Sequence, residues 1–137
     1  MNANGLLVMA AMTRNSAYAP YSHFQVGAAL LTEKGKIYTG CNIENAAYTP
    51  TNCAERTAFF KAVSEGERNF RAIAIVGGKE GSDEYDFCAP CGVCRQIMME
   101  FCDPEEFEII LGNSAGEIKI FKLKEILPMG FGAENLK

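Results

Sequence analysis

Two predicted helices each begin at a cysteine residue, Cys53 within residues 52–56 and Cys91 within residues 90–96. Cys91 and Cys94 are three residues apart, so a helix would place both sulfur atoms on one face. A proline directly before this pair suits the first turn of a helix, because its missing N–H would have no partner there. Backbone amides at a helix start also favour the thiolate form that binds a metal. If Cys53 reaches the same metal, the fold must bring two separate helix starts together.

The rest of the chain alternates between helical and extended patterns. Apolar periodicity and breaker residues predict helices over residues 4–18, 53–65, 91–101 and 123–127. Strands are predicted over residues 25–31, 36–42, 70–76, 107–111 and 117–121. This alternation predicts helices on both faces of a largely mixed sheet. We therefore expect an α/β fold in which residues 1–137 form a single domain, a three-layer α/β/α sandwich around a five-stranded mixed sheet.

Length and charge restrict the partners of this domain. A chain of 137 residues has the length of a single domain and can bury a substantial core without disulfides. Its 13 Lys and Arg residues against 17 Asp and Glu residues give a net charge of −4, which argues against nucleic acid held through phosphate contacts. The chain contains no apolar run of about 18 residues, so no membrane-spanning segment is predicted.

Cysteine usage and the N-terminal segment indicate a reducing compartment. Six cysteines fall below the density of a disulfide scaffold. The apolar run at residues 6–12 has no basic residue before it, as a signal peptide would require. We interpret it as part of an amphipathic helix with a stripe of Leu6, Met9, Ala10 and Thr13. A cytoplasmic location is expected, in which thiols stay free or bind metal.

With one histidine in the chain, any metal site must consist mainly of thiolates. Three ligands from Cys53, Cys91 and Cys94 would leave one position open, which is the pattern of a catalytic zinc. Glu55 would lie beside that position if the start of its helix points at the metal. Three thiolates on a divalent ion leave a net negative charge, which weakens Lewis acidity. We expect Arg56, one helical turn after Cys53, to donate to a ligand sulfur and offset this charge.

Other uses of these cysteines remain open at this point. A Cys-x-x-Cys pair alone is also typical of thioredoxin-like redox sites. Cys88, Cys91 and Cys94 have the spacing of an iron–sulfur motif, but no fourth cysteine follows where the motif needs one. A structural four-cysteine zinc site would take Cys41, Cys88 or Cys102 as its fourth ligand and would leave the glutamate without a role. We interpret these last three as ordinary buried or half-buried thiols.

The motif Cys53-Ala54-Glu55, followed by Pro90-Cys91-Gly92-Val93-Cys94, resembles that of the small zinc-dependent cytidine deaminases. The resemblance covers nearly the whole chain, from Tyr18-Ala19-Pro20-Tyr21-Ser22 through Gly40-Cys41-Asn42-Ile43-Glu44-Asn45 to Leu127-Pro128. A related signature has histidine at the first ligand position, from which Cys53 departs. This departure and the negative net charge disfavour an enzyme that edits polynucleotides.

This resemblance implies a hydrolytic enzyme with one zinc ion per subunit, held by Cys53, Cys91 and Cys94. It implies that zinc provides a hydroxide near neutral pH and that Glu55 shuttles protons to the base. The implied reaction converts cytidine and 2′-deoxycytidine to uridine and 2′-deoxyuridine with release of ammonia. In this family the reaction usually serves pyrimidine salvage.

The resemblance also implies which residues hold the nucleoside. Asn42 and Glu44, which an extended backbone directs to one side, are implied to bind the ribose hydroxyls, although both also suit a solvated turn. Phe24 is implied to stack near the pyrimidine, and the backbone of Ala54 to bind the base. As an alternative, Phe24 and Phe131 are ordinary core residues.

Small members of this family are homotetramers, so the resemblance implies that neighbouring subunits contribute Tyr48 and Phe131 to the site.

Two alternatives for the function remain. A sibling deaminase would act on another aminopyrimidine nucleoside, such as a nucleoside antibiotic. A non-enzymatic module would use zinc only for stability. We interpret His23 as a hydrogen-bonded structural residue.

Overall fold

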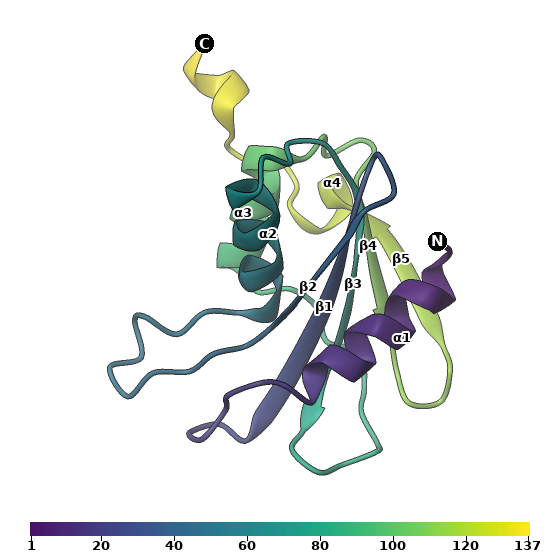
Figure 1. Cartoon of the computed structure of the whole chain (residues 1–137). Helices are drawn as coiled ribbons and strands as arrows, with labels where there is room; N and C mark the ends of the chain where they lie inside the picture. Colours follow the sequence, from purple (N-terminus) through teal and green to yellow (C-terminus); the bar gives the residue numbers. More distant parts are fainter.

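The structure is a computed structural model that describes residues 1–137 (Figure 1). Its elements are α1 (Ala3–Arg14), β1 (Phe24–Thr32), β2 (Ile37–Cys41), α2 (Ala54–Ser64), β3 (Phe70–Lys79), α3 (Gly92–Phe101), β4 (Glu108–Gly112), β5 (Ile118–Lys122), α4 (Leu123–Ile126) and a 3₁₀ turn, η1 (Ala133–Leu136). Every predicted helix and strand is present in the predicted order, and most bounds agree within one residue. No helix combines the length and apolar character needed to cross a membrane.

The five strands form one mixed sheet in the order β2-β1-β3-β4-β5. Only β3 and β4 run parallel, and α3 lies between them in the chain. The other neighbours pair antiparallel. Helix α1 covers one face of the sheet, while α2 and α3 lie together on the other (Figure 1). The three-layer α/β/α fold class expected from the alternation is therefore confirmed.

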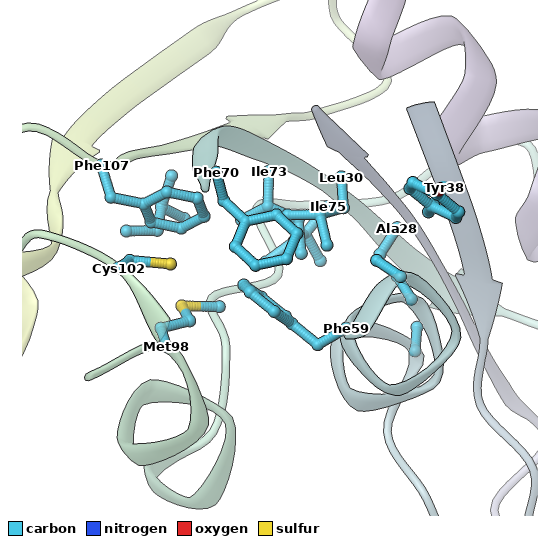
Figure 2. Close-up of a cluster of buried hydrophobic side chains, with 14 of the residues drawn as sticks. Ala28, Leu30, Tyr38, Phe59, Phe70, Ile73, Ile75, Met98, Cys102 and Phe107 are labelled. Carbon is cyan, nitrogen blue, oxygen red and sulfur yellow. The ribbon is translucent and has the colours of Figure 1, made fainter. Parts of the chain in front are cut away.

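Aromatic packing dominates the core between the sheet and helices α2 and α3. Phe59 of α2 is fully buried, and its ring centroid lies 5.1 Å from that of Phe70 and 6.0 Å from that of Phe107. Figure 2 shows these rings meeting Met98 of α3 and the apolar side chains of the strands. Burial of a large aromatic side chain stabilises a fold by roughly 3 kcal/mol. This layer thus holds α2 and α3 firmly in place.

Helix α1 packs on the opposite face along a stripe that differs in part from the prediction. Leu6 and Ala10 are fully buried as expected, but the stripe continues to Arg14. Met9 and Thr13, which were predicted to share the stripe, are only half-buried. Residues four apart lie on one face of a helix, so Leu6, Ala10 and Arg14 form a single buried stripe.

Helix α1 also ends earlier than predicted, at Arg14 rather than at residue 18. The backbone N–H of Tyr18 donates to the carbonyl of Asn42 at 2.9 Å, and Tyr18 forms a parallel bridge with Ile43. Tyr18 therefore pairs with the segment after β2 and cannot continue the helix. A long-range backbone pairing overrides the local helical pattern at this point.

Strand β3 extends to Lys79, beyond the predicted end at residue 76. Gly77 and Gly78, which follow the predicted strand, continue the ladder with β1, in which Phe24 pairs with Lys79. The chain after β3 folds back over these two glycines, with Cys88 against Gly77 and Tyr85 against Gly78. An ideal Cβ on Gly78 would lie 2.7 Å from Cβ of Tyr85. The glycine pair thus leaves room for the connection that leads to α3.

Two other glycines allow helices to lie directly on the sheet. An ideal Cβ on Gly27 of β1 would lie 2.0 Å from the carbonyl oxygen of Ala10 in α1. On the opposite face, an ideal Cβ on Gly40 of β2 would lie 2.5 Å from the carbonyl oxygen of Ala54 in α2. Real Cβ atoms do not approach backbone so closely, so each position requires glycine. Gly40 therefore determines how closely the first turn of α2 approaches the sheet.

Candidate functional site

Three cysteine sulfur atoms meet at the starts of α2 and α3. Cys53 is the N-cap residue of α2, Cys91 is the N-cap residue of α3, and Cys94 lies in the first turn of α3. Sγ of Cys91 lies 3.7 Å from Sγ of Cys53 and 3.6 Å from that of Cys94. All three sulfur atoms lie within 4.8 Å of one another. The structure thus brings together the three residues that were predicted to bind metal.

The charge state of the cluster fits a metal site. The thiol of Cys94 and the guanidinium of Arg56 lower the pKa of Cys53 to about 5. The contact with Cys53, together with burial, raises the pKa of Cys94. One sulfur is therefore readily ionised while its neighbour keeps a proton, which a bound cation would displace. Three converging thiols form a soft donor set of the kind that zinc prefers.

Two arginines near the cluster have different partners. Nη2 of Arg56 lies 3.3 Å from Sγ of Cys53, which is the contact expected from their spacing on one helix. Arg95 instead donates to backbone carbonyls, through Nε to Pro90 at 2.8 Å and through Nη1 to Ile126 at 2.6 Å. Arg95 thereby ties the start of α3 to α4 and does not contact a sulfur atom of the cluster.

The other three cysteines lie outside the cluster. No further Cys, His, Asp or Glu joins the three sulfur atoms as a fourth ligand. Cys102 is buried in the core beside Phe107, and Cys41 is half-buried on β2. Cys88 is half-buried and lines the cavity next to the cluster. The structure therefore supports neither a four-cysteine zinc site nor an iron–sulfur site.

Glu55 lies in the first turn of α2 and lines the same cavity as Cys53 and Cys91 of the sulfur cluster. Only 4% of this residue is exposed to solvent. Burial raises the pKa of its carboxyl group to about 7, and the charge of Cys53 adds to this effect. A carboxyl group with a pKa near neutral pH can both accept and donate a proton during a reaction. Its position and pKa suit proton transfer beside the sulfur cluster.

The cavity has a volume of about 320 Å³ and lies beside the sulfur cluster, with Cys53 and Cys91 in its lining. Four of the residues predicted to contact substrate line it, namely Phe24, Asn42, Glu44 and Ala54. They come from β1, the segment after β2, and α2. Its volume, and a lining of apolar side chains with a few polar groups, are typical of a site for a small molecule.

Asn42 already satisfies much of its hydrogen-bonding capacity within the protein. Its Oδ1 accepts from the backbone N–H of Val26 at 2.8 Å, and its Nδ2 donates to the carbonyl of Phe24 at 2.9 Å. The residue is buried, with 9% exposed, so it is not the solvated turn residue considered as an alternative. Asn42 therefore bridges the end of β1 to the segment after β2.

The carboxylate of Glu44 is also held by protein groups. It accepts from the backbone N–H groups of Tyr21 and Ser22, at 3.0 and 3.1 Å, and from the Ser22 hydroxyl. The Ser22 hydroxyl, followed by these amides, lowers the pKa of Glu44. Glu44 is therefore ionised at neutral pH and fixed in direction. Sequence reasoning did not identify Ser22, because its contact with Glu44 joins distant segments.

Tyr48 and Phe131 do not line the cavity of their own chain. Tyr48 is 74% exposed on the loop after β2, where its ring meets that of Tyr21 edge to face at 6.5 Å. Phe131 is 57% exposed near the C-terminus, and its carbonyl accepts from Gln96 of α3. His23, outside the cavity, contacts Glu80 at 3.2 Å.

A mixed sheet with helices on both faces, three thiols at two helix starts and a buried carboxyl group beside them define a metal-dependent α/β enzyme domain. A family profile described as "Cytidine and deoxycytidylate deaminase zinc-binding region" matches residues 2–108. The chain belongs to the cytidine deaminase family, and zinc is the metal that fits its three thiols.

Known proteins resemble the chain over nearly its whole length. A cytidine deaminase of Sporosarcina psychrophila is 49% identical over 136 residues, which cover 99% of this chain and 96% of the relative. The crystal structure of a cytidine deaminase from Burkholderia pseudomallei superposes with a TM-score of 0.87 at 45% identity, covering 96% of this chain and 100% of the other. A more distant relative is a blasticidin-S deaminase of Bacillus cereus, 34% identical over 77% of this chain and 76% of the relative.

Proposed function

We propose that the protein hydrolyses cytidine and 2′-deoxycytidine to uridine and 2′-deoxyuridine, with release of ammonia. The observation that carries this proposal is the buried Glu55 carboxyl group in the cavity that also contains Cys53 and Cys91. Full-length similarity to cytidine deaminases supports it. Pyrimidine salvage is the proposed role of the reaction.

We propose Cys53, Cys91 and Cys94 as the ligands of one zinc ion per subunit. Zinc held there would supply Lewis acidity, which would make water a nucleophile near neutral pH. The Glu55 carboxylate accepts a proton from the attacking water and passes it to N3 of the pyrimidine ring. The water oxygen bonds to C4, and Glu55 then moves the remaining proton of this new hydroxyl group to the amino group on C4. The C4–N bond breaks, ammonia leaves, and the oxygen stays as the carbonyl of the uracil ring. Arg56 stabilises the negative charge of the Cys53 sulfur through its hydrogen bond.

The same cavity provides groups for the rest of the nucleoside. The ionised Glu44 keeps unused lone pairs and accepts from a ribose hydroxyl, with Asn42 beside it. Phe24 offers an aromatic face to the pyrimidine ring, and the backbone of Ala54 binds its polar edge. The bonds that hold Asn42 and Glu44 within the protein reduce the entropy lost when substrate binds, because the two side chains are already oriented.

The assembly we propose is a homotetramer of one-domain subunits in the cytoplasm. Apolar side chains remain exposed on the side of α2 and α3, including Phe60 at 46% and Val93 at 56%. The C-terminal residues extend away from the sheet, beyond α3 (Figure 1). Tyr48 and Phe131 are thus available to complete the cavity of a neighbouring subunit. Light scattering at micromolar concentration measures the mass of the assembly directly, and a monomer that is fully active would contradict the shared site.

Two other functions have less support. A deaminase of a nucleoside antibiotic would share the metal site, but the relative named for such an activity is less similar to the chain, at 34% identity, than the cytidine deaminase at 49%. A module that uses zinc only for stability would leave the buried Glu55 without a role. Parallel assays with cytidine and blasticidin S separate the two enzymatic functions.

The decisive experiment follows the ultraviolet absorbance of cytidine with the zinc-loaded protein. Glu55→Gln is the matched variant, because it keeps the shape of the side chain and removes its ability to move a proton. We expect the variant to retain zinc and to lose roughly 100-fold to 10,000-fold in kcat. Bound zinc without any change in absorbance for the unmodified protein would refute the proposed function, and near-normal turnover in the variant would remove Glu55 from the mechanism.

A further inference from the structure

Two side chains that line one wall of the cavity, those of Cys88 and Phe24, pack against Gly77 near the end of β3. An ideal Cβ on Gly77 would lie 2.7 Å from Sγ of Cys88 and 3.1 Å from Cε2 of Phe24. Both side chains therefore rest against the same glycine, one from the connection before α3 and the other from β1. Because Gly77 lacks a side chain, it leaves room for Cys88 and Phe24 to lie next to each other.

This wall faces the reacting end of the cavity. Cys88 and Phe24 line the same cavity as Glu55 and Cys53. Cys88 is not a member of the sulfur cluster, and neither the metal site nor the proposed proton transfer uses it. Its remaining contribution is the space and the apolar surface that its side chain presents to whatever occupies the cavity.

Pyrimidine chemistry indicates which part of the substrate meets this wall, on the basis of the proposed function. The reacting carbon C4 must lie beside Glu55 and the metal, while the sugar lies toward Glu44. The ring atoms bonded to C4 are N3, which carries no substituent, and C5, which carries a hydrogen or a larger group. A side chain at the reacting end therefore contacts the substrate mainly at C5 and can limit the size of the substituent there.

We propose that Cys88, packed on Gly77 beside Phe24, determines how large a C5 substituent the cavity accepts. The size of the side chain at position 88 sets the space left beside C5, so a larger residue there would exclude C5 substituents that the thiol tolerates. Gly77 takes part indirectly as a positioning residue. The three atoms nearest to a methyl group on Gly77 all belong to the Cys88 and Phe24 side chains, so the methyl group would displace these side chains toward the cavity.

The experiment measures kcat/KM for 5-methylcytidine relative to cytidine in zinc-loaded variants. Cys88→Ala should raise this ratio about tenfold and Cys88→Leu should lower it by a similar factor, because one methylene group in an apolar pocket changes specificity by that order. Gly77→Ala should lower the ratio, and adding Cys88→Ala should restore it. Cys41→Ala removes a half-buried thiol outside the cavity and should leave the ratio unchanged.

A ratio within about twofold of the unmodified protein in both Cys88 variants, with zinc content retained, would overturn the proposal. An equal change in Cys41→Ala would do the same. The dissociation constants of uridine and 5-methyluridine, measured by calorimetry, test the effect of the C5 methyl group on binding without turnover, and Cys88→Ala and Cys88→Leu should shift their ratio in the same directions. If cytidine is not deaminated at all, the proposed function fails. The ratio of the dissociation constants still decides whether Cys88 limits the size of the C5 substituent.

Discussion

Nη2 of Arg56 lies 3.3 Å from Sγ of Cys53, one helical turn earlier on α2. The helix itself sets this contact, because residues three apart share a face. The guanidinium group also contacts the carbonyl of Thr51 at 3.5 Å, which limits its freedom to turn away. A permanent positive charge is thereby held against a metal-binding sulfur.

We predict that Arg56→Ala weakens zinc binding about tenfold, since groups that hydrogen-bond to metal ligands have effects of this size. Competition with a chromophoric chelator measures the affinity directly. Arg71→Ala is the matched control, because Arg71 is exposed on β3 and its removal changes the net charge equally. Zinc affinity in Arg56→Ala equal to that of the control would show that the contact does not support the metal.

Gly40 leads to a prediction about the position of α2. A Cβ there would lie 2.5 Å from the carbonyl oxygen of Ala54 and from the backbone nitrogen of Ala58. Gly40→Ala should therefore displace the start of α2, together with Cys53 and Glu55. A shift of about 1 Å is enough to lower kcat about 100-fold. Steady-state kinetics with matched measurements of melting temperature test this expectation.

Gly27→Ala provides the comparison for Gly40→Ala. The added methyl group meets the carbonyl oxygen of Ala10 at 2.0 Å, but on the face covered by α1. We expect it to lower the melting temperature while kcat and zinc affinity stay close to normal. If both variants lose kcat in proportion to their loss of stability, then Gly40 supports the fold in general and not the site in particular.

The buried thiol of Cys102 predicts a loss of stability at alkaline pH. Burial raises its pKa far above the ordinary value of 9.0. Well below pH 9.0 the thiol is protonated in both the folded and the unfolded state, so it adds no pH dependence. Above that pH only the unfolded state ionises, so stability falls by about 1.4 kcal/mol per pH unit.

Urea unfolding of the reduced, zinc-loaded protein between pH 8 and pH 10.5 measures this loss. Cys102→Ala should be less stable than the unmodified protein at pH 8, because it leaves a cavity in the core. The difference between the two should shrink as the pH rises, since the variant lacks the ionising group. A difference that stays constant over this range would contradict the assignment.

Much of the metal site was predictable because its parts are local. The spacing of Cys91 and Cys94, and that of Cys53 and Arg56, place each pair on one helical face. The alternation of helices and strands likewise predicted the layers. The errors came where distant segments pair, as when Tyr18 bonds to the carbonyl of Asn42 and ends α1 early.

The sequence by itself determined which side chains stand at the starts of α2 and α3, because helix geometry follows from short-range spacing. Only the tertiary structure decided that these starts meet, that Glu55 is buried beside them, and that Cys88 faces the cavity. These outcomes depend on close approaches at Gly40 and Gly77, where the absence of a side chain lets backbone and loop pack together. Local periodicity carries no information about such long-range contacts, so it could not have predicted them.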